Sequence, residues 1–180
     1  MNKRLIITAT SAGIVALLAL TLMAFRVTSL VGSRPVVGAL APDFELALFP
    51  EYRAGLSEKM RLSDLHGQVV VINFWASWCV ECKKEAADLE ATYRRFKERG
   101  VVFIGVDYLD TEKFAYSYLR EFNISYANGI DVQQRVAQLY RITGVPETFV
   151  VDKNGIIRRV ELQRMSAQQL SDAIELALGV

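Results

Sequence analysis

The stretch VVVINFWASWCVECKKE, residues 69–85, changes its pattern half-way along its length. Residues 69–75 form an apolar run rich in β-branched side chains, which predicts a strand buried in the middle of a sheet. From Cys79 onward the apolar residues recur at spacings of four and three, which predicts an amphipathic helix over residues 79–99. Its apolar stripe consists of Cys82, Ala86, Leu89, Tyr93 and Phe96. The two cysteines of the chain therefore stand where a buried strand gives way to a helix.

That position gives the cysteine pair a specific chemistry. Two residues so spaced at the start of a helix lie close enough for a disulfide, whose Cα atoms are about 4.4–6.8 Å apart. The unpaired N–H groups and partial positive charge of a helix N-terminus favour the thiolate form of Cys79. We expect Cys79 to be exposed and Cys82, one turn further on, to be less accessible, as disulfide exchange requires. The alternative, two ordinary buried cysteines, is less favoured by this placement between strand and helix.

The remainder of the sequence predicts an α/β domain. Residues 51–65 show no regular pattern, and residues 153–155 are typical of a hairpin turn. The next two helices are short, and the first should turn Phe114, Tyr118 and Leu119 inward. Parallel strands that alternate with helices, closed by an antiparallel hairpin, indicate an α/β layer. The further expected elements are strands at residues 41–49, 101–106, 147–151 and 156–162, and helices at residues 111–122, 132–140 and 166–178, the last with Ser166 as N-cap.

An uncharged apolar run, residues 5–25, precedes this domain. At about 1.5 Å per residue it reaches about 31 Å, the thickness of one hydrocarbon core. We therefore expect a transmembrane anchor at residues 1–26, a Gly-, Ser- and Pro-containing linker at residues 27–40, and a domain at residues 41–180. A cleaved signal peptide is the alternative. The positive-inside rule is nearly balanced, and the terminal amine favours a single-pass protein with its catalytic domain on the extracytoplasmic side of the cell membrane.

Composition excludes several other classes of protein. The 180 residues carry a formal net charge of +1, which gives no reason to expect nucleic acid as a partner. Two cysteines are too few for a disulfide-stapled scaffold or a four-cysteine zinc site. The single histidine, His66, is a poor indicator of a metal site, so neither a metal nor a cofactor is expected. A copper-delivery module needs a thiol pair and a distant histidine, and His66 is a weak candidate for that ligand.

Several motifs resemble one known family. The segment NFWASWC at residues 73–79, followed by CKKE, resembles the thioredoxin superfamily. More narrowly, it is similar to the membrane-anchored TlpA/ResA/CcmG branch, whose best-known members reduce apocytochrome c during cytochrome c maturation. Three further motifs match that branch: APDF at residues 41–44, LSDLHG at residues 62–67 and GVPETF at residues 144–149. The resemblance implies a thioredoxin-like fold, a central mixed β-sheet flanked by helices, with a Cys79–Cys82 dithiol.

The resemblance also implies roles for residues that bind the client protein. The Val145–Pro146 bond should be cis and face the disulfide, since proline makes the cis form accessible. Proline also lacks an N–H, which leaves the Val145 backbone free to pair with an incoming peptide. Independently of the resemblance, Trp78 should flank the disulfide and contact the substrate, because aromatic side chains supply apolar contact area at recognition surfaces.

Glu85 stands where this branch keeps an acidic residue, whereas general thioredoxins carry a buried Asp at the position of Asn73. A partly buried Glu85 would have a raised pKa and could exchange a proton with Cys82 during catalysis. The alternative is a solvated glutamate paired with neighbouring lysines. Many relatives have proline where this chain has Glu81, whose charge disfavours a nearby thiolate and makes the pair more reducing.

The favoured function is a membrane-anchored, extracytoplasmic thiol–disulfide oxidoreductase that reduces apocytochrome c. The expected partners are a disulfide-containing exported protein and a membrane thiol–disulfide electron donor. A general reductase or isomerase of exported proteins is the main alternative. A peroxiredoxin is disfavoured because residues 73–78 do not supply the threonine-bearing proline loop of that family.

Overall fold

The computed structural model describes residues 34–179. The predicted membrane anchor at residues 1–26 lies outside the described residues. Within the described range no helix is both long enough and apolar enough to cross a bilayer.

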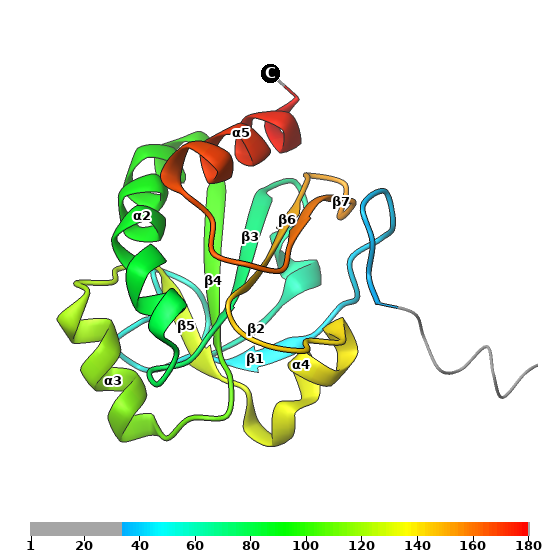
Figure 1. Ribbon diagram of the computed structural model, residues 1–180. Helices are drawn as coiled ribbons and strands as arrows, with labels where there is room; N and C mark the ends of the chain where they lie inside the picture. Colours follow the sequence, from blue (N-terminus) through cyan, green and yellow to red (C-terminus); the bar gives the residue numbers. More distant parts are fainter. Residues whose placement is uncertain (1–33, 180) are drawn as a thin grey trace, which may run out of the picture. The chain divides into compact units, whose positions relative to one another are not determined.

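A five-stranded mixed sheet forms the centre of the domain, in the order β5-β4-β3-β6-β7 (Figure 1). Strands β3, β4 and β5 are parallel, whereas β6 runs antiparallel to β3 and β7 antiparallel to β6. Every residue of the central strand β3 is buried, as its apolar sequence predicts. The strands are β3 (Val69–Trp75), β4 (Val101–Asp107), β5 (Ala127–Ile130), β6 (Glu147–Val151) and β7 (Ile157–Glu161).

Helices cover both faces of this sheet (Figure 1). One apolar cluster joins one face of β3 to the buried sides of α2, α3 and α5. A second cluster joins the other face to α4 and to a separate two-stranded sheet, β1–β2. The chain therefore has the predicted thioredoxin-like α/β fold. The elements are α2 (Val80–Phe96), α3 (Glu112–Glu121), α4 (Arg135–Tyr140), α5 (Ala167–Leu178), β1 (Glu45–Ala47), β2 (Lys59–Arg61) and the 3₁₀ turns Leu62–Leu65, Lys97–Arg99 and Val132–Gln134.

Strand direction decides which segments meet at the end of the sheet where the two cysteines lie. Because β3 and β4 are parallel, their C-terminal ends, and the loops that follow, lie at the same edge. Because β6 is antiparallel to β3, it starts at that edge, which brings Val145 and Pro146 there. The cysteine motif and the Val145–Pro146 segment, far apart in sequence, are thereby placed together.

Two strands differ from the sequence-based expectation. The strand expected at residues 41–49 is only the short β1, which pairs with β2 inside the stretch that we expected to be irregular. Strand β5 was not predicted, because its Asn128-Gly129 pair is typical of a turn. Glycine is needed there because a Cβ on Gly129 would lie 2.2 Å from the carbonyl oxygen of Ala47. The close approach of another segment, rather than a turn, accounts for this glycine.

The inward orientation expected for Phe114 is wrong. Its side chain is 56% exposed, whereas Ala115, Tyr118 and Leu119 are buried. The buried stripe of α3 runs through Ala115, so the neighbouring Phe114 turns to solvent at the first turn of the helix.

The segment before Ala41 is joined to the β6–β7 hairpin by backbone hydrogen bonds. The N–H of Gly38 donates to the carbonyl of Ile157 at 2.8 Å, and the N–H of Ala41 donates to that of Gly155 at 2.8 Å. The compact unit of the chain begins at Pro35. Residues 38–40, which we expected to belong to the linker, are thus part of the folded domain.

Candidate active site

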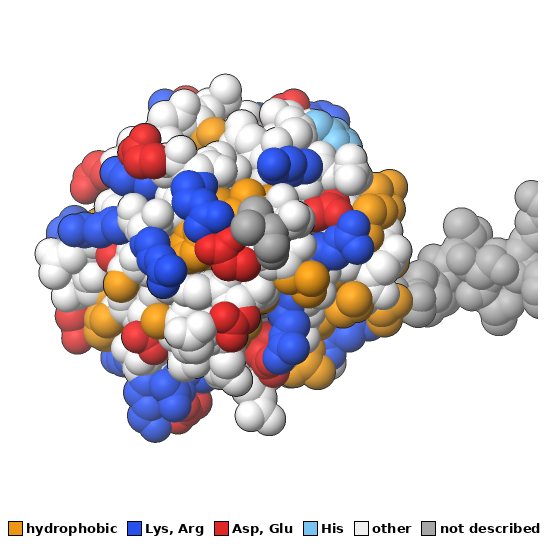
Figure 2. Space-filling model, turned by 90° about the horizontal axis from the view of Figure 1, so that it is seen from above, with side chains coloured by type: hydrophobic (Ala, Val, Ile, Leu, Met, Phe, Trp, Pro, Cys, Tyr) orange, Lys and Arg blue, Asp and Glu red, His pale blue; other side chains and the backbone are white. Residues whose placement is uncertain are grey.

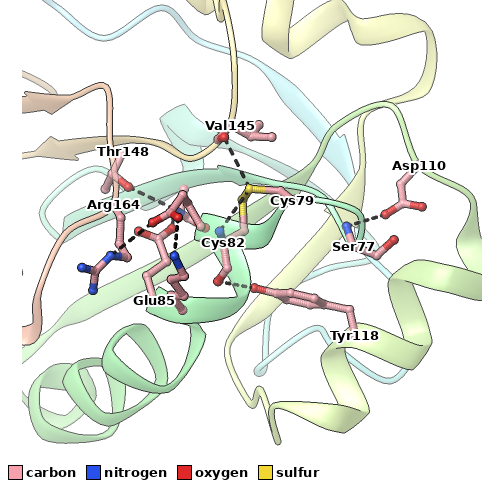
Figure 3. The surroundings of a disulfide bond; sticks show 12 residues. Ser77, Cys79, Cys82, Glu85, Asp110, Tyr118, Val145, Thr148 and Arg164 are labelled. Carbon is pink, nitrogen blue, oxygen red and sulfur yellow. Dashed lines mark hydrogen bonds and ion pairs between the residues drawn. A yellow bond between two sulfur atoms is a disulfide. The ribbon is translucent and has the colours of Figure 1, made fainter.

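A disulfide joins Cys79 and Cys82 at the first turn of α2, with their Cα atoms 5.3 Å apart (Figure 3). Cys79 is the N-cap of this helix, and its Sγ accepts a hydrogen bond from the Cys82 N–H at 3.0 Å. The sulfur of Cys79 therefore lies on the positive end of the helix dipole. After reduction, the same N–H and dipole favour a thiolate at Cys79 over one at Cys82.

Cys79 is more buried than the sequence suggested. It is 5% exposed and Cys82 is fully buried, so the predicted order of accessibility holds but the expected open position of Cys79 does not. The carbonyl oxygen of Val145 lies 3.4 Å from the Cys79 sulfur and covers part of it. Of the two cysteines, Cys79 is the one with surface open to an incoming reagent.

The Val145–Pro146 segment lies beside the disulfide (Figure 3). Its peptide bond is cis. Pro146 is buried, and Val145 is partly buried with its carbonyl directed at the sulfur. Trp78, which directly precedes Cys79, is 57% exposed, and its indole N–H donates to the Leu109 carbonyl at 3.0 Å. Both predicted substrate contacts therefore border Cys79, and their role in binding stays a prediction.

Glu85 is fully buried one turn beyond Cys82. One carboxylate oxygen accepts from the Asn73 side-chain amide at 2.9 Å, and the other accepts from the Met165 N–H at 3.1 Å. Burial raises the pKa of Glu85 to about 7, although both hydrogen bonds and the charge of Arg164 act in the opposite direction. The alternative of a solvated glutamate does not fit this position. Near neutral pH the carboxyl can both release and accept a proton.

The Asn73 side chain connects Glu85 to the strand that follows the cis proline. Its amide group donates to Glu85 and also to the hydroxyl of Thr148 on β6, at 3.0 Å (Figure 3). A carboxylate at position 73 would place a second negative charge against Glu85. The neutral amide therefore allows Glu85 to be the acidic group on this side of the disulfide.

An aromatic pair contacts the cysteine-bearing first turn of α2 from the α3 side. The rings of Trp75 and Tyr118 stack with their centroids 4.3 Å apart. The Tyr118 hydroxyl donates to the backbone carbonyl of Cys82 at 2.9 Å (Figure 3). The Trp75 indole N–H donates to the side chain of Asn128 at 2.9 Å. The sequence identified Tyr118 only as a core residue, since nothing in its helical pattern reports a hydrogen bond to Cys82.

The loop after β4 runs along the loop that carries Cys79. The Tyr108 N–H donates to the Trp75 carbonyl at 2.8 Å, and the Ser77 N–H donates to the Asp110 carboxylate at 2.7 Å. Together with the bond from Trp78 to Leu109, these contacts hold the approach to Cys79 at three successive points.

Asp107, the last residue of β4, is fully buried and was not singled out by the sequence. Neither of its carboxyl oxygens has a hydrogen-bond partner within residues 34–179. Burial, and then the nearby charge of Asp110, raises the pKa of Asp107 to about 8. At neutral pH this carboxyl is therefore mostly protonated.

Two other residues considered from the sequence lie at the surface. Glu81 is exposed and pairs with Lys84 at 2.6 Å, and the hydrogen bond from Lys84 lowers the pKa of Glu81. His66 is exposed and precedes β3, about 23 Å of strand away from the cysteines. Figure 2 shows the histidine, in pale blue, at the surface of the protein. In the described part of the chain no three His, Cys, Asp or Glu side chains are grouped as a metal site requires.

Comparison with known proteins places this geometry in a family. The AhpC/TSA family matches residues 37–160. The thiol–disulfide oxidoreductase ResA of Oceanobacillus iheyensis is 34% identical over 124 residues, which are 69% of this chain but only 64% of that protein. ResA of Geobacillus kaustophilus is 32% identical over 143 residues, 77% of this chain and 76% of that protein.

A solved structure supports the same assignment. The crystal structure of a putative thiol:disulfide interchange protein DsbE from Chlorobium tepidum is 26% identical, with a TM-score of 0.71. The likeness covers 81% of this chain and 99% of that one. These relatives confirm the class of enzyme that the cysteine motif predicts, a thiol–disulfide oxidoreductase. The chain therefore belongs to the AhpC/TSA family, in which it is similar to ResA.

Proposed function

We propose that this protein is a membrane-anchored, extracytoplasmic reductase of protein disulfides, with apocytochrome c as its client and a membrane thiol–disulfide protein as its electron donor. The observation that carries the proposal is the buried Glu85, held by Asn73 and Met165 one turn beyond Cys82. A disulfide reductase must deprotonate a buried resolving thiol, and a carboxyl with a pKa of about 7 is suited to that step at neutral pH.

The reaction begins with the reduced form of the pair. The Cys79 thiolate attacks one sulfur of the client disulfide, which forms a mixed disulfide and releases the client's other sulfur as a thiolate. Glu85 then takes the proton of the Cys82 thiol. The Cys82 thiolate attacks the Cys79 sulfur, closes the protein disulfide and releases the client's first sulfur. The client gains two electrons, and a dithiol donor returns two electrons to the protein disulfide.

Glu85 would act on Cys82 rather than on Cys79. It follows Cys82 by one helical turn on the buried side of α2, whereas Cys79 lies at the N-cap, where the helix dipole already favours its thiolate. The helix dipole therefore activates the attacking Cys79, and the Glu85 carboxylate activates the resolving Cys82.

A general reductase or isomerase of exported proteins is the second candidate. Trp78, Val80 and Leu109 are large apolar side chains, each more than half exposed. Trp78 and Val80 flank Cys79 in sequence, and the backbone carbonyl of Leu109 accepts a hydrogen bond from the Trp78 indole. Such an apolar surface offers contact area but no hydrogen-bonding groups that would distinguish one client from another, so it suits many unfolded clients.

The test is a trapping and rate experiment. The Cys82→Ser variant should accumulate a mixed disulfide between Cys79 and an oxidised peptide of the haem-attachment type, C-x-x-C-H, seen by mass spectrometry. The Cys79→Ser variant is the matched control and should form none. If wild type reduces this peptide at least about tenfold faster than an unrelated disulfide peptide of equal length, the cytochrome assignment gains support. Equal rates favour the general reductase, and no exchange with either peptide refutes the proposal.

The membrane placement needs its own experiment. Alkaline phosphatase is active only outside the cytoplasm, so a fusion after the last residue of the full chain should be active. An inactive phosphatase fusion beside an active cytoplasmic reporter would overturn the proposed orientation.

A further inference from the structure

A hollow of about 420 Å³ opens at the same end of the sheet as the disulfide. It begins at Tyr108, directly after β4, and reaches Thr143, two residues before Val145. Its lining residues are Tyr108, Gln134, Ala137, Gln138, Arg141, Ile142 and Thr143. A client strand that pairs with the Val145 backbone would therefore pass the rim of this hollow.

Arg141 gives the hollow a positive charge. It is the charged residue among those that line the hollow, and its side chain is exposed. Within residues 34–179 its guanidinium forms neither an ion pair nor a hydrogen bond; its backbone N–H donates to the Gln138 carbonyl. The nearby carboxylate of Glu147 is buried and accepts both the N–H and the hydroxyl of Thr143. The side-chain amides of Gln134 and Gln138 are neutral hydrogen-bond donors near the guanidinium, which has no ion-pair partner among the described residues. This combination of groups suits the binding of a carboxylate.

Two residues that line the hollow, and one next to it, have left-handed backbone conformations. Arg141 has φ +56° and Gln134 has φ +57°, and Leu109, next to Tyr108, has φ +51°. Left-handed conformations are unfavourable for residues other than glycine, and they concentrate where a ligand or substrate is clamped. Arg141 is the C-cap of α4, so its position relative to Val145 is set by the end of that helix.

We propose that this hollow binds an acidic side chain of the client protein, an Asp or Glu close to the client cysteine that Cys79 attacks. The inference rests on the proposed function and adds a preference for sequence to it. Arg141 precedes Val145 by four residues, so the two residues are at most about 13 Å apart along the chain. A client residue two to four positions from the attacked cysteine spans about 7–13 Å and reaches the guanidinium. Arg141 is thus a specificity-determining residue that takes no part in the sulfur chemistry.

The experiment uses oxidised peptides that differ at one position. One peptide carries Asp three residues from the attacked cysteine, and the other carries Asn at the same position. Each peptide is made in two versions, with this residue on the N-terminal or on the C-terminal side of the cysteine. Steady-state reduction is measured with the wild type and with Arg141→Gln. The matched control is Arg135→Gln, an exposed arginine of the same helix that bonds Gln133 and does not line the hollow. Hydroxyethyl disulfide, small and uncharged, measures the sulfur chemistry alone.

The expected result is specific to one variant and one peptide. Arg141→Gln should raise the KM for the Asp peptide by about three- to fivefold, the range of an exposed ion pair. It should not change kcat for the Asp peptide, the KM for the Asn peptide or the rate of hydroxyethyl disulfide reduction. Arg141→Lys should retain most of the preference for the Asp peptide over the Asn peptide. Arg141→Glu should reverse the preference, so that a peptide with Lys at that position becomes the better substrate.

Two results overturn the proposal and can be told apart. In the first, wild type reduces hydroxyethyl disulfide and both peptides, but Arg141→Gln changes the KM for the two peptides equally, or no more than Arg135→Gln does. This result refutes the binding role of the hollow and leaves the proposed function standing. If wild type reduces none of these disulfides, the proposed function fails and the preference for acidic clients falls with it.

Discussion

Replacing Asp107 by Asn tests whether a buried, uncharged carboxyl stands at the end of β4. Asp107 is fully buried, and its two oxygens lack partners in the described residues, so its charged form would be an unpaired charge in the interior. Its pKa rises from the ordinary value of 3.8 to about 8 because of burial and then Asp110. Asparagine has nearly the same shape and cannot ionise.

The sign of the effect follows from proton binding. Between pH 4 and 8 the folded protein holds a proton at Asp107 that the unfolded chain has lost, so the free energy of unfolding falls as the pH rises through this window. At about 1.4 kcal/mol per pH unit, the interval from 3.8 to about 8 gives a ceiling of about 6 kcal/mol. Relaxation around the charge offsets part of this, so we expect Asp107→Asn to be about 3 kcal/mol more stable than wild type at the upper end of the window.

Urea unfolding of the oxidised protein, followed by tryptophan fluorescence across this pH range, measures the difference. The stability gap between Asp107→Asn and wild type should grow with pH and be small at its acidic end. Asp172→Asn is the control, because Asp172 is exposed on α5, and its curve should run parallel to wild type. A gap between Asp107→Asn and wild type that does not change with pH would refute the reasoning.

Three further substitutions probe the surroundings of the disulfide. Glu85→Gln should remove the inflection near pH 7 from the rate at which Cys82 resolves a mixed disulfide, measured by stopped-flow fluorescence; superimposable pH profiles would exclude the proton-transfer role. Tyr118→Phe removes the hydrogen bond to the Cys82 carbonyl and should lower the free energy of unfolding by about 1 kcal/mol in urea, so an unchanged midpoint would contradict that contact. Gly105→Ala would place a Cβ 1.8 Å from the Asn128 side-chain oxygen and should destabilise the fold by about 1–3 kcal/mol, whereas wild-type stability would mean that Asn128 moves without cost.

Local pattern was sufficient for the elements whose sequence and environment agree. The buried strand β3 and the helix α2 were recognisable because an apolar, β-branched run is followed directly by a helical stripe. Ser166 was identified as an N-cap, and it accepts from the Gln169 N–H as such a residue should. In these cases each residue's local preference matches the tertiary structure.

Long-range contacts decided what the sequence could not show. Glu85 accepts a hydrogen bond from the backbone of Met165, eighty residues away, and periodicity placed Glu85 only at the edge of the buried face. Strand β5 contains an Asn-Gly pair that local rules assign to a turn, yet Gly129 is required by the close approach of Ala47. Asp107 ends an apolar strand, and its sequence neighbours do not report that its carboxyl is fully buried.

The central claim, that the Cys79–Cys82 pair donates electrons to other disulfides, is tested most directly by its reduction potential. Residues 35–180, the compact unit, are equilibrated in a series of thiol–disulfide buffers, and tryptophan fluorescence reports the reduced fraction. Our account predicts a value near that of thioredoxin, about −270 mV, at which the dithiol gives up its electrons readily. A value near about −120 mV, that of a strong oxidant, would mean that the protein forms disulfides instead and would contradict the account.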